Sequence, residues 1–123
     1  MRFMTIPINY KFHGLEEAQG LTTLVDQKFA ALQKFVHDDK PISCDVEFEK
    51  VASSQNGQVF RVEANVMLNG TLYRADATEE SFEKAIDEVR AELDKEFRRA
   101  KEKSVDLNKK AAREAKEQLL NGT

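Results

Sequence analysis

The chain has 123 residues, of which 41% are hydrophobic and 33% are charged, and its formal net charge is -3. This length and composition fit one folded domain with a heavily charged surface, and no stretch approaches the ~20 apolar residues of a membrane-spanning helix. The single cysteine, Cys44, excludes an internal disulfide and fits a reducing compartment. Because the N-terminus has no recognisable secretion signal, we expect a cytoplasmic protein.

The first half of the chain predicts a strand, a helix and a second strand. Residues 5–10 alternate apolar and polar side chains, and Pro7, which lacks a backbone donor, places this strand at a sheet edge. The apolar positions of residues 17–36 recur every three or four residues, as on one face of a helix. Residues 42–49 alternate again, so this strand should have one buried and one solvent-facing side.

The second half of the chain predicts a hairpin followed by a second helix. Residues 60–68 alternate and end at Asn69-Gly70, the strongest short signal for a hairpin turn. Residues 71–77 return as the fourth strand, and Thr78 is a suitable N-cap for the helix after it. The order β-α-β-β-β-α predicts an α+β fold, in which a four-stranded sheet carries both helices on one face.

The helical pattern loosens after residue 103. Residues 104–123 are rich in side chains of high helix propensity, but they lack a wide apolar face. They therefore either prolong the second helix or form an independent tail. We divide the chain into an α+β domain of residues 1–103 and a C-terminal extension of residues 104–123.

Charge is distributed unevenly along the chain. Residues 97–116 carry a net charge of +5, whereas residues 1–96 carry -7. An acidic body with a basic end suggests an anionic partner. A solvated helix end, where the macrodipole favours cations, would produce the same pattern.

The second helix is predicted to carry a basic stripe on its outer side. Arginine binds phosphate bidentately and lysine binds it as a point charge, and no aromatic side chain is interleaved for base stacking. The stripe therefore predicts binding to the backbone of folded RNA rather than sequence reading. Measured from the core-facing Leu93, the sector from about 140° to 240° holds Lys84, Lys95, Arg98 and Arg99.

No motif of catalysis or metal binding is recognisable, so we expect no enzyme, no metal, no cofactor and no small-molecule substrate. His13 and His37 lie near opposite ends of the first helix, without further ligands at a suitable spacing. Cys44 falls on the apolar side of its strand, where cysteine behaves as a small hydrophobe. A weaker candidate for a cation site, which we interpret as a solvated strand face, is formed by Asp45, Glu47 and Glu49.

Three segments carry a resemblance to a known family. They are the end of the first helix at residues 28–35 (KFAALQKF), the two strands around the Asn-Gly turn at residues 62–77, and the second helix at residues 82–103, with its AID motif and basic run. Together they resemble the ribosome hibernation promoting factor and ribosome-associated translation inhibitor family, once called sigma-factor modulation proteins. The resemblance covers about residues 5–103.

The resemblance implies a protein that binds the small ribosomal subunit between head and body, where messenger and transfer RNA would sit. Such a protein inhibits translation by steric occlusion and promotes ribosome hibernation under stress or in stationary phase. Because the chain stops at Thr123, it resembles the short form, which lacks a dimerisation domain. Carried over position by position, the ribosomal RNA contacts are Lys28, Lys34, Lys95, Arg98, Arg99, Lys101 and Lys103, with Arg74 and Lys84 as weaker candidates.

Two other functions are open from the residues alone. One is a general binder of structured RNA, and the other is a protein-interaction module that docks through the apolar residues of its tail. Glu92 stands where the family commonly has lysine, which bears on affinity. A monomer away from the ribosome is compatible with the sequence, which does not determine the oligomeric state. The apolar tail residues through which the protein-interaction module would dock are Val105, Leu107, Leu119 and Leu120.

Overall fold

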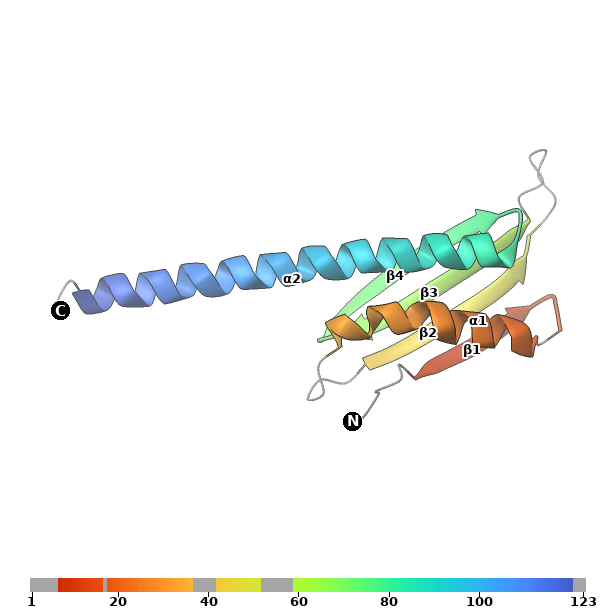
Figure 1. Cartoon of the computed structure of the whole chain (residues 1–123), viewed down its shortest axis with the longest axis horizontal. Helices are drawn as coiled ribbons and strands as arrows, with labels where there is room; N and C mark the ends of the chain where they lie inside the picture. The colour runs from red at the N-terminus through yellow and green to blue at the C-terminus, as the bar shows by residue number, and fades with distance from the viewer. Residues whose placement is uncertain (1–6, 17, 37–41, 52–58, 121–123) are drawn as a thin grey trace.

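Two helices cover one face of a four-stranded sheet (Figure 1), which confirms the expected α+β fold. The computed structural model describes residues 7–16, 18–36, 42–51 and 59–120. The elements are β1 (Ile8–His13), α1 (Gln19–Phe29), the 3-10 helix η1 (Ala30–Phe35), β2 (Ile42–Lys50), β3 (Phe60–Leu68), β4 (Thr71–Glu79) and α2 (Phe82–Leu120).

The sheet has the order β1-β2-β3-β4, with β1 parallel to β2 and the other pairs antiparallel. β1 lies at an edge of the sheet, as Pro7 predicts, but the strand runs over Ile8–His13 rather than residues 5–10. The shift has a physical reason, because Tyr10 and Phe12 continue the inward alternation of Ile8 and pack against the core. Residues 5 and 6 of the expected strand lie outside the described residues.

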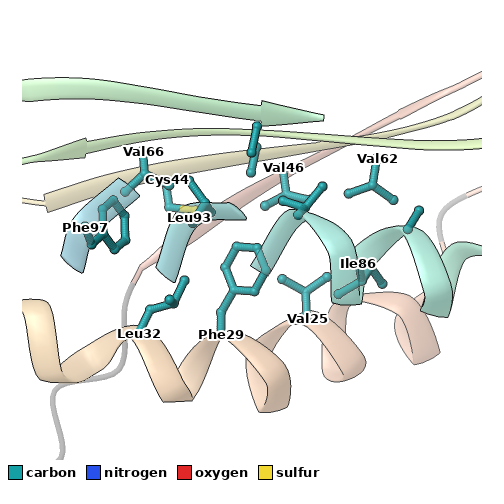
Figure 2. Packing of buried hydrophobic residues seen from close by; sticks show 14 of the residues in the cluster. Val25, Phe29, Leu32, Cys44, Val46, Val62, Val66, Ile86, Leu93 and Phe97 are labelled. Carbon is teal, nitrogen blue, oxygen red and sulfur yellow. The ribbon is translucent and has the colours of Figure 1, made fainter. Parts of the chain in front are cut away.

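The hydrophobic core lies between the sheet and the two helices. Figure 2 shows Phe29 and Leu32 reaching up from the first helical segment towards Leu93 and the inner side of the sheet. α2 lies over β3 and β4 and packs against α1. Cys44 is buried in this core, where burial raises the pKa of its thiol to about 12, so it is a packing residue, as expected.

The first helix is shorter than its periodicity predicts. The expected helix of residues 17–36 becomes an α-helix to Phe29 followed by a 3-10 helix to Phe35. Leu32 and Phe35 are both buried, and a three-residue spacing brings two side chains to the same side in a 3-10 helix. The tighter winding therefore keeps both residues in the core.

The start of α2 differs from the expected N-cap. β4 extends to Glu79 because Phe60 pairs with Glu79 and Arg61 with Thr78, so Thr78 belongs to the strand and the prediction of a cap there is wrong. The backbone N–H of Lys84 instead donates to the Ser81 side-chain oxygen at 3.2 Å. Ser81 therefore caps the helix.

The hairpin between β3 and β4 turns as predicted. Asn69 has φ 53° and Gly70 has φ 82°, the two positive values that a type I′ turn requires. This turn pairs Met67 with Leu72. Residues that pair across β3 and β4 lie on the same face of the sheet, so the two strands alternate between buried and exposed faces in step.

α2 is a single helix of 39 residues that runs far beyond the sheet (Figure 1). Of the two expectations for residues 104–123, the described part to Leu120 prolongs the second helix. Every residue from Lys101 to Leu120 is exposed. Among the described residues, none of the helices is both long and apolar enough to cross a bilayer.

Candidate nucleic-acid interface

The outer side of α2 is positioned by the packing of its inner side. Ile86, Val89, Leu93 and Phe97 are buried against the sheet and α1, so the opposite side must face solvent. At about 100° per residue, that opposite side is the basic stripe expected from the sequence. Its members Lys84, Lys95, Arg98 and Arg99 are all exposed.

A shallow groove runs along this outer side at the C-terminal end of the domain. Ala91 contributes only a methyl group to its wall, so a bulky ligand can approach the helix closely. The groove is lined by four basic side chains, Arg90, Lys95, Arg98 and Arg99, and by two acids, Asp94 and Glu102.

Two cations from different elements meet beside Phe35. The Arg98 guanidinium donates to Asp94 at 2.9 Å, and the Lys34 ammonium lies 3.7 Å from the same carboxylate. Both cations also lie over the Phe35 ring, 5.2 Å (Lys34) and 5.9 Å (Arg98) from its centroid. Burial of Asp94 opposes ionisation, but the hydrogen bond from Arg98 and the charge of Lys34 together lower the pKa of Asp94. Asp94 thus brings the two cations together on the surface.

Lys28 serves the contact between the two helices. Its ammonium lies 2.6 Å from Asp87 and 4.0 Å from Glu83, both on α2. Only 24% of the Lys28 side chain is exposed. Its charge is therefore largely compensated by two acids of the neighbouring helix.

Lys84 is also compensated, by acids that precede the helix. Its ammonium lies 3.0 Å from Glu80 and 4.0 Å from Glu79. The hydrogen bond to Glu80 and the charges of Glu80 and Glu79 raise the pKa of Lys84. Lys84 therefore lies on the stripe but among acidic neighbours.

Arg74 stands on the sheet, whereas most of the other candidate residues lie on α2. It stands on β4, where it donates to Asn65 at 2.9 Å and lies 3.2 Å from Glu63 on the neighbouring strand. A second groove beside β4 joins Arg74 to Lys95 but also contains Glu88 and Glu92. The structure therefore joins Arg74 to Lys95 but does not bring it to Lys34 and Arg98, which meet at Asp94.

The remaining candidates are exposed on α2. Arg99 lies 3.4 Å from Glu96. Within the described part of the chain, Lys95, Lys101 and Lys103 take part in no ion pair. Their ammonium groups are the ones most available to an external anion.

Arg90 is a basic residue of the groove that the sequence reasoning missed. It lies about 60° from Leu93, at the border of the apolar stripe, and is half-buried. The available signal was its spacing of four from Asp94 and eight from Arg98, which places all three on one side of the helix.

The open face of the sheet has the opposite character. Arg61 is held there by Glu49 at 3.7 Å, Glu63 at 3.5 Å and Asp76 at 3.2 Å, so its charge is more than compensated. Asp45 and Glu47 add to the acidic side chains on this face. No group of three His, Cys, Asp or Glu side chains in the described residues could hold a metal ion. A basic helix on one side and an acidic sheet face on the other would orient the molecule on a polyanion.

Comparison with known proteins identifies the family. The family model described as "Sigma 54 modulation protein / S30EA ribosomal protein" matches residues 8–105. The chain belongs to this family, which confirms the resemblance seen in the sequence. It is therefore a ribosome-associated binding protein of the ribosome-hibernation type and not an enzyme.

Two solved structures share the fold. The N-terminal domain of Protein Y from Thermus thermophilus has a TM-score of 0.61 at 23% identity, over 78% of this chain and 98% of that chain. A ribosomal subunit interface protein from Coxiella burnetii has a TM-score of 0.60 at 20% identity, over 76% of this chain and 96% of that one. No similar sequence was found among the curated proteins.

Proposed function

We propose that this protein binds the small ribosomal subunit in the channel for messenger and transfer RNA and inhibits translation by occupying that space. Membership of a ribosome-associated family supports the partner. The observation that carries the proposal is the groove on the outer side of α2, where Lys95, Arg98 and Arg99 lie together at the end of the domain. Occlusion requires shape and affinity but no catalytic group.

The candidate contacts divide by how their charge is compensated. Lys95, Lys101 and Lys103 can bind phosphate without first breaking an ion pair to any described residue, and Lys34, Arg98 and Arg99 keep donors free beside single acids. We expect these residues to supply most of the affinity. Contacts by Lys28, Lys84 and Arg74 would compete with the acids that already hold them, so their share should be smaller.

The proposal includes the cellular location and the conditions in which the protein acts. A ribosome-bound inhibitor of this kind acts in the cytoplasm, and it silences ribosomes under stress or in stationary phase. A ribosomal RNA surface is anionic, so the acidic open face of the sheet, with Asp45, Glu47 and Asp76, would point away from it. This distribution of charge favours binding through the outer side of α2.

Co-sedimentation with purified small ribosomal subunits at low and moderate salt tests the proposal. The wild-type chain should bind at low salt and dissociate as salt rises, because each phosphate contact releases counterions. The variant Lys95→Glu/Arg99→Glu should lose at least about tenfold in affinity, and its log–log salt slope should fall by about 2, one for each contact.

A matched control makes the same change in net charge at positions on the sheet, away from the α2 groove. Lys11→Glu/Lys50→Glu reverses two exposed cations on β1 and β2, away from the α2 groove, and should bind as the wild type does. Equal loss in both variants would mean that only net charge matters, which contradicts a defined interface. A general binder of structured RNA would instead bind an unrelated RNA hairpin as tightly as the subunit.

A further inference from the structure

The exposed half of α2 carries a second cluster of cations beyond the residues that match the family. The family model ends at residue 105, whereas the helix continues to Leu120 with every side chain exposed. The part of α2 after residue 105 contains four cations, which we call the distal cluster. They are Lys109, Lys110, Arg113 and Lys116.

The distal cluster faces the same way as the groove on the domain. Measured from Leu93, its four cations fall between about 140° and 260° around the helix, and Lys95, Arg98 and Arg99 fall between about 140° and 240°. The two sets therefore lie on one side of a continuous helix. At a rise of about 1.5 Å per residue, their centres are about 22 Å apart.

The acids of the exposed helix separate the two sets of cations. Glu102 and Asp106 lie between them in the same sector, Glu117 ends the sector, and Glu114 lies outside it. The pattern is therefore two cationic patches with an acidic interval, not one unbroken stripe. Such a pattern fits contact with a nucleic-acid backbone at two separate places.

The helix itself is suited to hold the distal cluster at a fixed distance. Its first half is packed against the sheet, so the costly nucleation step is already made and the remainder only propagates. Ala111, Ala112 and Ala115 have the highest helix propensity. The extension therefore needs only propagation, and not a new nucleus, to form a helix.

The apolar residues of the extension do not form a competing surface. A partner groove would need apolar side chains on one face. Measured from Leu93, three of the four exposed apolar residues lie near about 80°, 120° and 180° and the fourth near about 320°, but the first two are about 21 Å apart along the helix, so no continuous apolar face forms. They are Leu119, Val105, Leu120 and Leu107.

We propose that the distal cluster is a second RNA-binding site, which contacts the phosphate backbone of ribosomal RNA about 20 Å beyond the primary interface. The inference rests on the proposed function and extends it to a segment outside the family match. The long helix then acts as an arm that adds affinity and fixes the orientation of the domain, because two separated contacts resist rotation better than one.

The test compares two full-length variants in the same co-sedimentation assay. Lys109→Gln/Lys110→Gln/Arg113→Gln/Lys116→Gln removes the distal charges while glutamine keeps a high helix propensity. Leu107→Gln/Leu119→Gln/Leu120→Gln removes exposed apolar groups and leaves every charge. Far-UV circular dichroism should confirm that both variants keep the helix.

The inference expects the charge variant to lose at least about tenfold in affinity at about 0.1 M salt and about 2 to 4 units of salt slope. The apolar variant should bind as the wild type does. An unchanged affinity and slope in the charge variant would overturn the inference while leaving the primary interface intact. Loss of binding in the apolar variant alone would overturn it in favour of a protein partner. A wild-type chain that fails to bind the subunit would overturn the proposed function as well.

Discussion

At the scale of single residues, Asp94 links the stability of the domain to its candidate interface. Its carboxylate holds Arg98 at 2.9 Å and Lys34 at 3.7 Å, and 19% of its side chain is exposed. The same contacts that stabilise the fold therefore reduce the positive charge that the interface presents. One substitution can separate the two effects.

We expect Asp94→Asn to lower the free energy of unfolding by about 0.5–1 kcal/mol at pH 7, the range of partly exposed ion pairs. The pKa of Asp94 is lowered in the folded state, so its stabilisation is fully present above the unfolded pKa of about 3.9. It is lost as the pH falls through the folded pKa. Urea unfolding at a series of pH values from 7 downward should show a difference from the wild type that persists at pH 5 and narrows as the pH falls below about 3.9.

The control is Asp106→Asn, the same change at an exposed position on the extension. It should leave the free energy of unfolding unchanged. For ribosome binding, Asp94→Asn should raise the affinity more than Asp106→Asn does, because it releases Lys34 and Arg98 in addition to adding one net positive charge. Equal gains would argue that Asp94 does not restrain the interface.

At the scale of elements, the β3–β4 hairpin and the start of α1 each contain a glycine. Only the glycine of the hairpin has a backbone conformation that favours glycine over other residues. Gly70 has φ 82°, in the left-handed region, whereas Gly20 lies in α1, and a Cβ there would meet nothing within 4 Å. The same substitution should therefore have opposite signs at the two positions.

Gly70→Ala should destabilise the protein by about 1 kcal/mol, because L-residues are disfavoured at that φ. Gly20→Ala should stabilise it by about 0.5 kcal/mol through helix propensity. Thermal or urea unfolding of both variants measures the difference. A stabilising effect of Gly70→Ala would contradict the type I′ turn.

The exposed part of α2 makes a second prediction at this scale. A proline in a helix interior costs about 3 kcal/mol locally, so Asn108→Pro should interrupt the helix near the middle of the exposed part. Because residues 101–120 are exposed, the unfolding midpoint of the domain should not change while the far-UV helical signal falls. A lowered midpoint would mean that the extension contacts the domain.

At the scale of the whole molecule, the long helix makes the protein asymmetric. A compact chain of this length would have a radius of gyration of about 14 Å, but 39 helical residues alone span about 58 Å. Small-angle scattering of the monomer should therefore give a maximum dimension of at least about 58 Å and a clearly larger radius of gyration. The Asn108→Pro variant should give a broader distribution of distances. A maximum dimension near 40 Å for the wild type would contradict the projecting arm.

The sequence by itself determined the parts of the fold that depend on neighbouring residues. The alternation of residues 42–48 and 60–68 identifies the buried side of each strand, the sterics of Asn69-Gly70 identify the turn, and the helical period of α2 identifies its outer side. These signals are local, because side-chain direction repeats every two residues in a strand and every 3.6 in a helix. The basic stripe could be predicted for the same reason.

Only the tertiary structure decided which charges are available. Lys28 and Asp87 are far apart in the sequence and meet because α1 packs on α2, and Thr78 joined a strand rather than a helix because β3 pairs with it. Pairs three or four residues apart on one helix can be predicted from the helical period, but a pair between two elements depends on distances that no local period encodes. The sequence could therefore indicate a basic helix and the local pair between Lys84 and Glu80, but the packing of α1 on α2 decided that Lys28 is compensated, while Lys95 takes part in no ion pair with the described residues.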